Sequence, residues 1–190
     1  MRKILSMLSI AVLTLLAVPI GSAVRAQEHK APKPSPGLAA EILEQWNETG
    51  KKLAGMAADF PEDKFDYKAT PAERTFAEQL LHAAGANYFF IDASQGKKAS
   101  MDVENPPRST YKTRAQVVDF INKVYAEGAA EIKKQGDKGM LEAVKSPFEN
   151  VMNTRAALFM FAIAHANDHY GQCVVYYRLN GLVPPESRKQ

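Results

Sequence analysis

The chain has 190 residues and a formal net charge of +3, with 24 basic and 21 acidic side chains. Three of those bases lie in the first 26 residues, which contain no acid, so residues 27–190 carry no net charge. This balance excludes the broadly basic surface with which proteins bind nucleic acid, and we expect no nucleic-acid partner. The remaining length is enough for one domain with a buried core.

The N-terminal residues 1–26 have the pattern of a secretory signal peptide. Arg2 and Lys3 precede an uncharged apolar run, and Val24 and Ala26 stand where small residues favour cleavage after Ala26. An uncleaved membrane anchor is the alternative, but the run is shorter than the ~20 apolar residues that span a bilayer. We therefore expect a secreted or periplasmic protein without stable membrane insertion after cleavage.

Residues 27–37 are polar and rich in proline and lysine, which predicts a flexible tether. His29 lies in this tether and is treated as incidental. Apolar residues at helical spacing then predict a first helix over residues 38–58, after Gly37. Residues 60–71 predict a loop.

The second predicted helix covers residues 72–94. Thr70 is expected to be its N-cap, with Pro71 at the first helical position. A long polar loop over residues 95–112 follows, and Thr113 or a neighbour is expected to cap a third helix.

The third helix is expected to end within residues 133–139, and an irregular segment follows it. Asn153 or Thr154 then caps a fourth helix over residues 155–180, which Gly181 ends. No segment has the period-two pattern of a strand, and no internal repeat is present.

Four amphipathic helices predict an all-α fold, namely a four-helix bundle with long crossover loops over residues 38–187. The single cysteine, Cys173, lies in an apolar run, which indicates a small buried residue. A reactive thiol is the alternative.

Two histidines lie on the predicted inward face of the fourth helix. His165 and His169 are four residues apart, so both rings can reach one metal ion. His82 falls on the apolar face of the second helix. A buried imidazole needs a partner for each ring nitrogen, and one shared metal ion supplies a partner to all three rings. The sequence therefore predicts a three-histidine metal site with an open coordination position.

Polar neighbours are expected to orient the ligating rings. Gln172 lies one turn after His169, and Glu78 lies one turn before His82. Asp168 points away from the inward face and is expected to be solvated or to pair with another helix. At the end of the fourth helix, Tyr176, Tyr177 and Arg178 either line a pocket and bind an anion or pack in the core and against neighbours.

Two stretches resemble the DinB family of DinB/YfiT-like metalloenzymes. They are "DFPEDKFDYKATPAERTFAEQLLHAAGANYFF" and, far downstream, "AHANDHYGQCVVYYRLNGLVPPES". The resemblance implies a four-helix bundle and a divalent metal ion held by His82, His165 and His169. It also implies a possible homodimer, because members commonly dimerise. Several relatives are thiol-dependent transferases or isomerases, and others have no known activity.

Three functional hypotheses follow from these patterns. The first is an exported metal-dependent hydrolase or transferase that acts on a small molecule, with zinc, nickel, manganese or iron as the ion. Hydrolysis suits an exported protein, because small thiol cosubstrates belong to the reducing cytoplasm. The second is a non-catalytic, metal-stabilised bundle or ligand-binding protein. The third is a bundle whose core histidines bind no metal.

Overall fold

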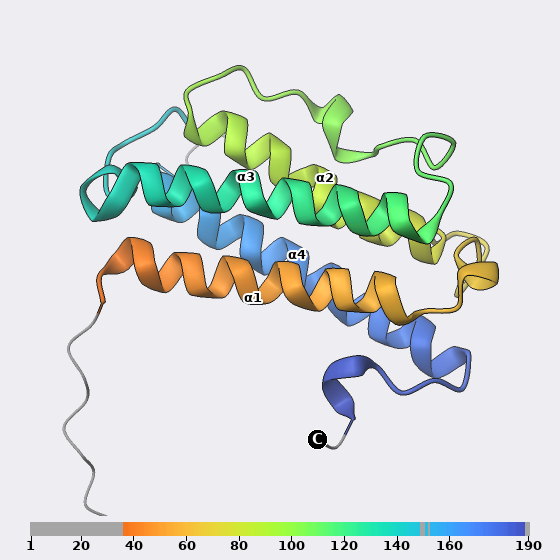
Figure 1. Ribbon diagram of the computed structural model, residues 1–190. Helices are drawn as coiled ribbons and strands as arrows, with labels where there is room; N and C mark the ends of the chain where they lie inside the picture. The colour runs from red at the N-terminus through yellow and green to blue at the C-terminus, as the bar shows by residue number, and fades with distance from the viewer. Residues whose placement is uncertain (1–35, 149–150, 152, 189–190) are drawn as a thin grey trace, which may run out of the picture. The chain divides into compact units, whose positions relative to one another are not determined.

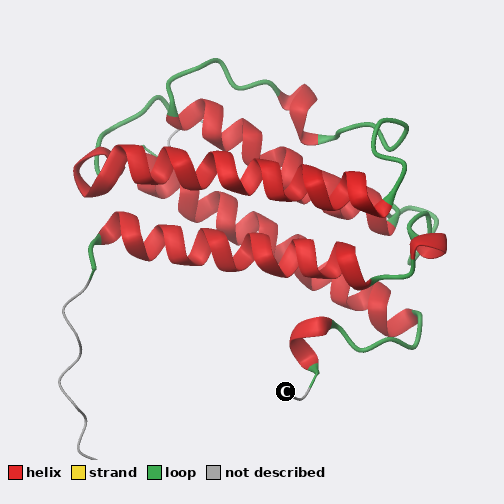
Figure 2. Cartoon of the chain, in the orientation of Figure 1, coloured by secondary structure: helices red, strands yellow, loops and turns green. Residues whose placement is uncertain are grey.

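The computed structural model describes residues 36–148, 151 and 153–188 (Figure 1). The predicted signal peptide and most of the predicted tether, including His29, lie outside the described residues. Four long helices and no strand make up this part of the chain, which confirms the all-α fold class (Figure 2). The helices are α1 (Leu38–Asp59), α2 (Phe76–Ser94), α3 (Arg114–Met140) and α4 (Arg155–Leu179).

Three single-turn helices lie in the connections, and they are η1 (Glu62–Lys64), η2 (Met101–Glu104) and η3 (Pro185–Ser187). Helix α1 packs against α3 and α4, and α2 packs against the same two helices from the opposite corner. Figure 1 shows α2 and α3 running in one direction and α1 and α4 in the other. The segment between α2 and α3 crosses the length of the bundle, so the topology differs from simple up-down-up-down.

Threonine side chains begin three of the four helices. Thr113 and Thr154 are the N-caps of α3 and α4, as the sequence predicts. Helix α2 begins at Phe76 with Thr75 as its cap, so the predicted start at residue 72 with Thr70 as cap is wrong. The chain contains two successive Thr-x-x-Glu patterns, and the second one, Thr75 with Glu78, forms the capping box.

The first Thr-x-x-Glu pattern forms a turn, because the preceding chain is tied to the start of α2. Lys68 forms a β-bridge with Thr75. The backbone N–H of Phe76 donates to the Tyr67 carbonyl at 3.0 Å, and that of Ala77 donates to the Phe65 carbonyl at 3.0 Å. These bonds satisfy N–H groups that a helix leaves without partners at its start.

Helix α2 is buried over nearly its whole circumference. Most of its side chains are inaccessible, because α3, α4 and η2 cover it on three sides. A helix enclosed in this way needs no solvated face, which explains its apolar composition. None of the helices in the described residues is long and apolar enough to cross a membrane.

Helices α1 and α3 approach closely through glycine. The Trp46 side chain is fully buried, and its Nε1–H donates to the backbone carbonyl of Tyr125 at 2.8 Å. The indole ring lies over Gly128, where an added Cβ would lie 2.1 Å from Trp46 Cζ2. A Cβ at Gly50 would lie 2.4 Å from the Tyr125 ring. The two glycines therefore lower helix propensity but permit the closest packing in this half of the bundle.

We predict that Gly128→Ala lowers the free energy of unfolding by about 1–3 kcal/mol, because the methyl group overpacks the Trp46 site. Urea denaturation followed by circular dichroism measures this change. Gly55→Ala in α1 is the matched control, since no atom lies within 4 Å of its added Cβ. The control should raise stability by about 0.5–1 kcal/mol through helix propensity. Equal effects of the two substitutions would contradict the packing explanation.

Candidate metal centre

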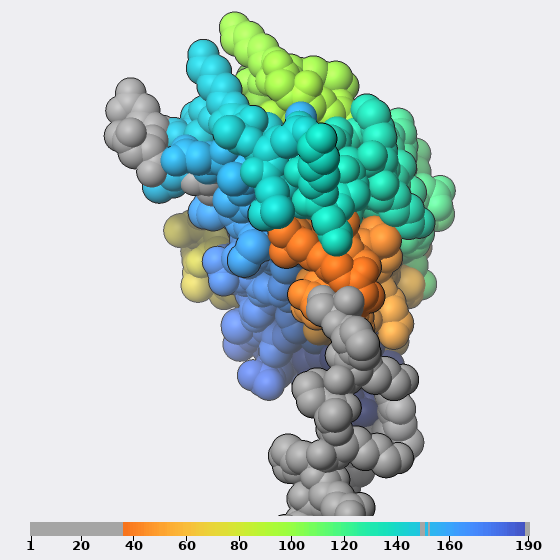
Figure 3. Space-filling view, turned by 90° about the vertical axis from the view of Figure 1, so that its left-hand side faces the viewer, coloured from red at the N-terminus to blue at the C-terminus, as the bar shows by residue number. Residues whose placement is uncertain are grey.

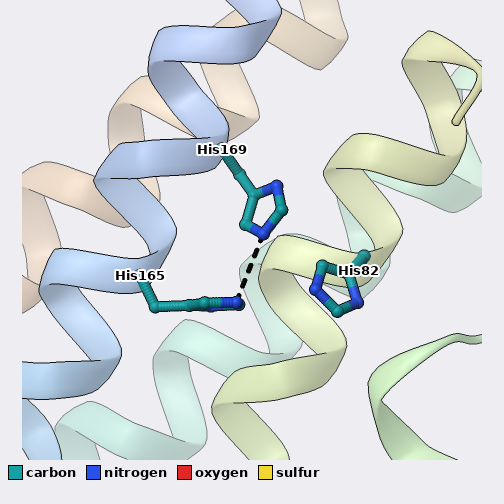
Figure 4. Close-up of side chains that lie close together, drawn as sticks. All are labelled: His82, His165 and His169. Atoms are coloured by element: carbon teal, nitrogen blue, oxygen red, sulfur yellow. Dashed lines mark hydrogen bonds between the residues drawn. The ribbon is translucent and has the colours of Figure 1, made fainter. Parts of the chain in front are cut away.

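The three predicted histidines meet between α2 and α4. His82 projects from the middle of α2, and His165 and His169 project from successive turns of α4 (Figure 4). One ring nitrogen from each lies within 4.8 Å of the others. Within the described ranges, no other group of three or more histidine, cysteine or acidic side chains has a geometry that can hold a metal ion. The structure thus brings together residues that are more than 80 positions apart in the chain.

The contact within the α4 pair fits a shared ion. Nε2 of His165 and Nε2 of His169 are 3.2 Å apart, as the dashed line in Figure 4 marks. Two nitrogens at zinc–nitrogen bond lengths in a tetrahedral site lie about 3.3 Å apart. The α4 pair therefore already has the spacing of two ligands. All three nitrogens lie within 4.8 Å of one another, so a ring has to move closer for all three to bind one ion.

The tautomer of His82 is fixed by the crossover segment after η2. Its Nδ1 lies 3.0 Å from the backbone carbonyl of Glu104 and 3.0 Å from Oδ1 of Asn105. A backbone carbonyl only accepts hydrogen bonds, so Nδ1 of His82 carries the proton. In the neutral ring, Nε2 is then the atom with a free lone pair, which is the form that binds a metal.

Gln79 orients His169 in the same way. Nδ1 of His169 donates to Oε1 of Gln79 at 2.8 Å, so the lone pair of its Nε2 points at His165. The amide nitrogen of Gln79 donates in turn to Oε1 of Gln172 at 2.5 Å. Gln172, which the sequence analysis placed beside the site, thus acts through Gln79. Gln79 is almost completely buried, at 1% exposure, so its bond to His169 is shielded from water, whereas Gln172 at the other end of the chain is exposed.

The prediction that Glu78 orients His82 is wrong. Its carboxylate accepts the backbone N–H of Thr75 at 2.8 Å, which closes the capping box of α2. The orienting groups that sequence reasoning missed are Gln79 and Asn105. Gln79 had a signal, since it is a polar residue on the same helical face as His82. No sequence signal pointed to Asn105, because it lies in the polar segment between α2 and α3, which has no periodic pattern.

His165 is the least constrained of the three rings. It is half-buried, and its buried Nδ1 has no hydrogen-bond partner among the described residues. Asp168 is exposed, as expected, and its charge partly offsets the effect of burial on the pKa of His165. Because no hydrogen bond holds Nδ1 of His165, this ring can rotate when a metal ion binds, whereas hydrogen bonds at Nδ1 hold the rings of His82 and His169.

Burial keeps all three rings neutral. It is the largest cause that lowers the pKa of His82, His165 and His169 below the usual value, and it lowers the pKa of His169 to about 3. The positive charge of Arg74 lowers the pKa of each ring further. Neutral imidazole is the ligating form, so burial leaves each ring with a nitrogen free of a proton.

The other residues near the end of α4 pack in the core. Cys173 is fully buried, and burial raises the pKa of its thiol to about 12, which favours a packing role. The Tyr176 hydroxyl donates to the Arg74 carbonyl at 2.5 Å, and the Tyr177 hydroxyl donates to the Met56 carbonyl at 2.9 Å. Arg178 is exposed. This arrangement supports the packing alternative for the two tyrosines.

We predict that Gln79→Leu weakens zinc binding by about tenfold to a hundredfold, because His169 loses the acceptor that fixes its ring. Competition against a chromophoric chelator measures the dissociation constant. Gln79→Glu keeps an acceptor at the same position and should retain most of the affinity. If both variants bind zinc as the wild type does, Gln79 does not orient a ligand.

The lowered pKa values predict a dependence of stability on pH in the metal-free protein. Below a pH of about 6.5 the unfolded chain binds protons at histidine that the folded chain excludes, so the free energy of unfolding falls as the pH falls. For His169 this loss extends down to its folded pKa of about 3. Urea denaturation at a series of pH values, with chelator present, should show this slope. His169→Gln should have a shallower slope, and an unchanged slope would refute the assignment.

Comparison with known proteins bears on the fold and on the family. A crystal structure of a DinB-like protein from Bacillus cereus ATCC 10987 superposes with a TM-score of 0.63 at 19% sequence identity, over 77% of this chain and 95% of that one. At that identity the likeness speaks to the fold. No curated protein matches the chain. The sequence profile of the DinB family matches residues 31–188, which include all of the described helices, and the chain therefore belongs to the DinB family.

Proposed function

We propose that this protein is an exported, divalent-metal-dependent hydrolase or transferase that acts on a small molecule. The observation that carries the proposal is the convergence of His82, His165 and His169 with two of the rings held in the ligating tautomer. Nε2 of His82 and Nε2 of His169 are left with lone pairs, and Nε2 of His165 lies 3.2 Å from that of His169. A cation among these nitrogens satisfies all of them at once.

Three histidine ligands leave a coordination position for water or substrate. The bound ion would supply Lewis acidity and a lowered pKa for a bound water or thiol. Gln79 and Asn105 would hold the rings in place during turnover. The enclosed helix α2 would keep water from the inner side of the site, since its side chains are buried nearly all round.

Hydrolysis and thiol transfer remain the two chemical variants of the proposal. Cys173 is fully buried with a raised pKa, so this chain does not offer a thiolate of its own at the site. A transferase would therefore need an external thiol, whereas a hydrolase needs only water. Turnover of a substrate panel with and without added small thiols distinguishes the two variants.

The second candidate is a non-catalytic bundle that the metal stabilises, or a protein that binds a ligand at the open position. One observation favours it, namely that the ligand set joins two helices whose sequences are far apart, so an ion would cross-link α2 and α4. This candidate predicts a large gain in thermal stability with metal but no turnover of any panel substrate. Zinc, nickel, manganese and iron all accept imidazole ligands.

Export and dimerisation are further parts of the proposal. Export is based on the signal-peptide pattern of residues 1–26 and predicts the mature protein outside the cytoplasm. A homodimer is supported by exposed apolar side chains on α4, which are Met160, Phe161, Val175 and Leu179. Size-exclusion chromatography with light scattering tests the oligomeric state.

We predict about one divalent ion per chain when the protein is expressed from its full sequence and purified without a histidine tag. Mass spectrometry of bound metals measures this content. The His165→Ala, His169→Ala double variant should lose the ion, because two of its three ligands are removed. His29→Ala is the matched control and should keep the ion, since His29 is not one of the three proposed ligands.

The result that contradicts this prediction is a wild-type protein that takes up no zinc, nickel or manganese even after incubation with each ion. The histidines would then be core residues alone. Full metal retention in the double variant would instead place the ion elsewhere in the chain.

A further inference from the structure

Arg74 is a positive charge beside the metal centre, and its charge also acts on the Glu104 carboxylate, where it partly offsets the rise in pKa that burial causes. It lies in the extended segment just before the N-cap of α2, and its side chain is exposed. Nη2 donates to Oδ1 of Asn105 at 3.3 Å, and no ion pair involves Arg74 within the part of the chain that the structure describes. Because Asn105 also contacts Nδ1 of His82, the guanidinium is separated from a predicted ligand by a single side chain.

Arg74 places a positive charge close to the histidine centre. Its guanidinium and the His82 ring both contact Oδ1 of Asn105, so Arg74 lies close enough to repel a cation held by the three rings. Three neutral imidazoles bring no negative charge to balance a divalent ion. With Arg74 beside it, the loaded centre would have an uncompensated positive charge, which an anion bound between the ion and the guanidinium would neutralise.

A cavity of about 370 Å³ adjoins Arg74. Lys68, Arg74 and Arg108 line it, together with Asn105, so the cavity and the histidine centre share the Asn105 side chain. Its volume lies in the range of small-molecule sites. It opens at the start of α2, whereas the rings of the centre lie further along the same helix.

Existing contacts leave two of these three cations available to a ligand. Arg108 is already held by the Asp66 carboxylate at 2.8 Å. Lys68 forms no ion pair among the described residues, and neither does Arg74. Two carboxylates line the cavity as well, and Glu78 is occupied by the capping box. Glu73 in the lining and Glu104 beside it are then the acids that compete for the cations.

The backbone holds both available cations in place. The Tyr176 hydroxyl, from α4, donates to the Arg74 carbonyl at 2.5 Å. The β-bridge between Lys68 and Thr75 fixes the backbone of Lys68 beside the start of α2. A guanidinium on a fixed backbone can form two parallel hydrogen bonds with a carboxylate or a phosphate. Binding then has to order only the two side chains and not their backbone.

We propose that the small molecule bound at the metal centre is an anion, and that Arg74 and Lys68 bind its carboxylate or phosphate group in this cavity. This inference rests on the proposed function, because it places the reacting end of the same molecule at the ion. Arg74 is a binding residue in this arrangement, and Asn105 connects it to the ligand His82.

Isothermal titration calorimetry tests the inference in two steps on the full-length protein. Zinc is titrated first into the metal-free protein, and inorganic phosphate is then titrated into the zinc-loaded protein freed of excess zinc. The variant is Arg74→Gln, which keeps a donor for Asn105 and removes the charge. Arg178→Gln is the matched control, because Arg178 is also exposed and lies nine residues past His169 on α4, ~13 Å along the helix axis.

We expect Arg74→Gln to bind zinc at least as tightly as the wild type, since a repelling charge is gone, and to bind phosphate at least about tenfold more weakly. Arg178→Gln should match the wild type in both steps. The anion inference is overturned if wild type and Arg74→Gln bind phosphate equally tightly, or if the zinc-loaded wild type binds no phosphate. In both cases the proposed function still stands, because the wild type binds zinc. A wild type that binds no zinc overturns the proposed function itself.

Discussion

The side-by-side packing of α2 and α4 is the constraint on which the rest of the structure depends. Two buried imidazoles and one half-buried imidazole lie at this contact, and the buried ones must find partners there because water is largely excluded. Gln79 and the end of η2 supply those partners for two rings, which ties the crossover segment to α2. The position of η2 against α2 is thus a consequence of the buried polar centre as well as of apolar packing.

The two halves of the bundle are stabilised differently. The α1–α3 half is apolar and tightly packed, with Trp46 lying against Tyr125 and Gly128. The α2–α4 half accepts polar groups at its centre and connects them by hydrogen bonds. Figure 3, seen from one end of the molecule, shows α1 and α3 meeting as adjacent surfaces over that end of the bundle. A rigid apolar half allows the other half to carry a buried polar site without loss of the fold.

Much of this arrangement follows from local sequence. Helical periodicity gives α1 nearly to the residue, and periodicity with threonine caps does the same for α3 and α4. The four-residue spacing of His165 and His169 predicts their shared face. The start of α2 does not follow, because two similar capping patterns compete and a β-bridge decides between them. The contact of Asn105 with His82 does not follow from local sequence either. It depends on the path of the segment between α2 and α3, which has no periodic pattern.

The ligand set also determines the order in which the site can assemble. His165 and His169 share one helix, so an isolated α4 can already chelate an ion through both rings once it is helical. His82 joins only after the crossover segment, α3 and α4 have been synthesised and α4 has docked on α2. Loading of a metal ion would therefore be coupled to the last long-range docking step of folding, so the complete centre would exist only in the folded chain.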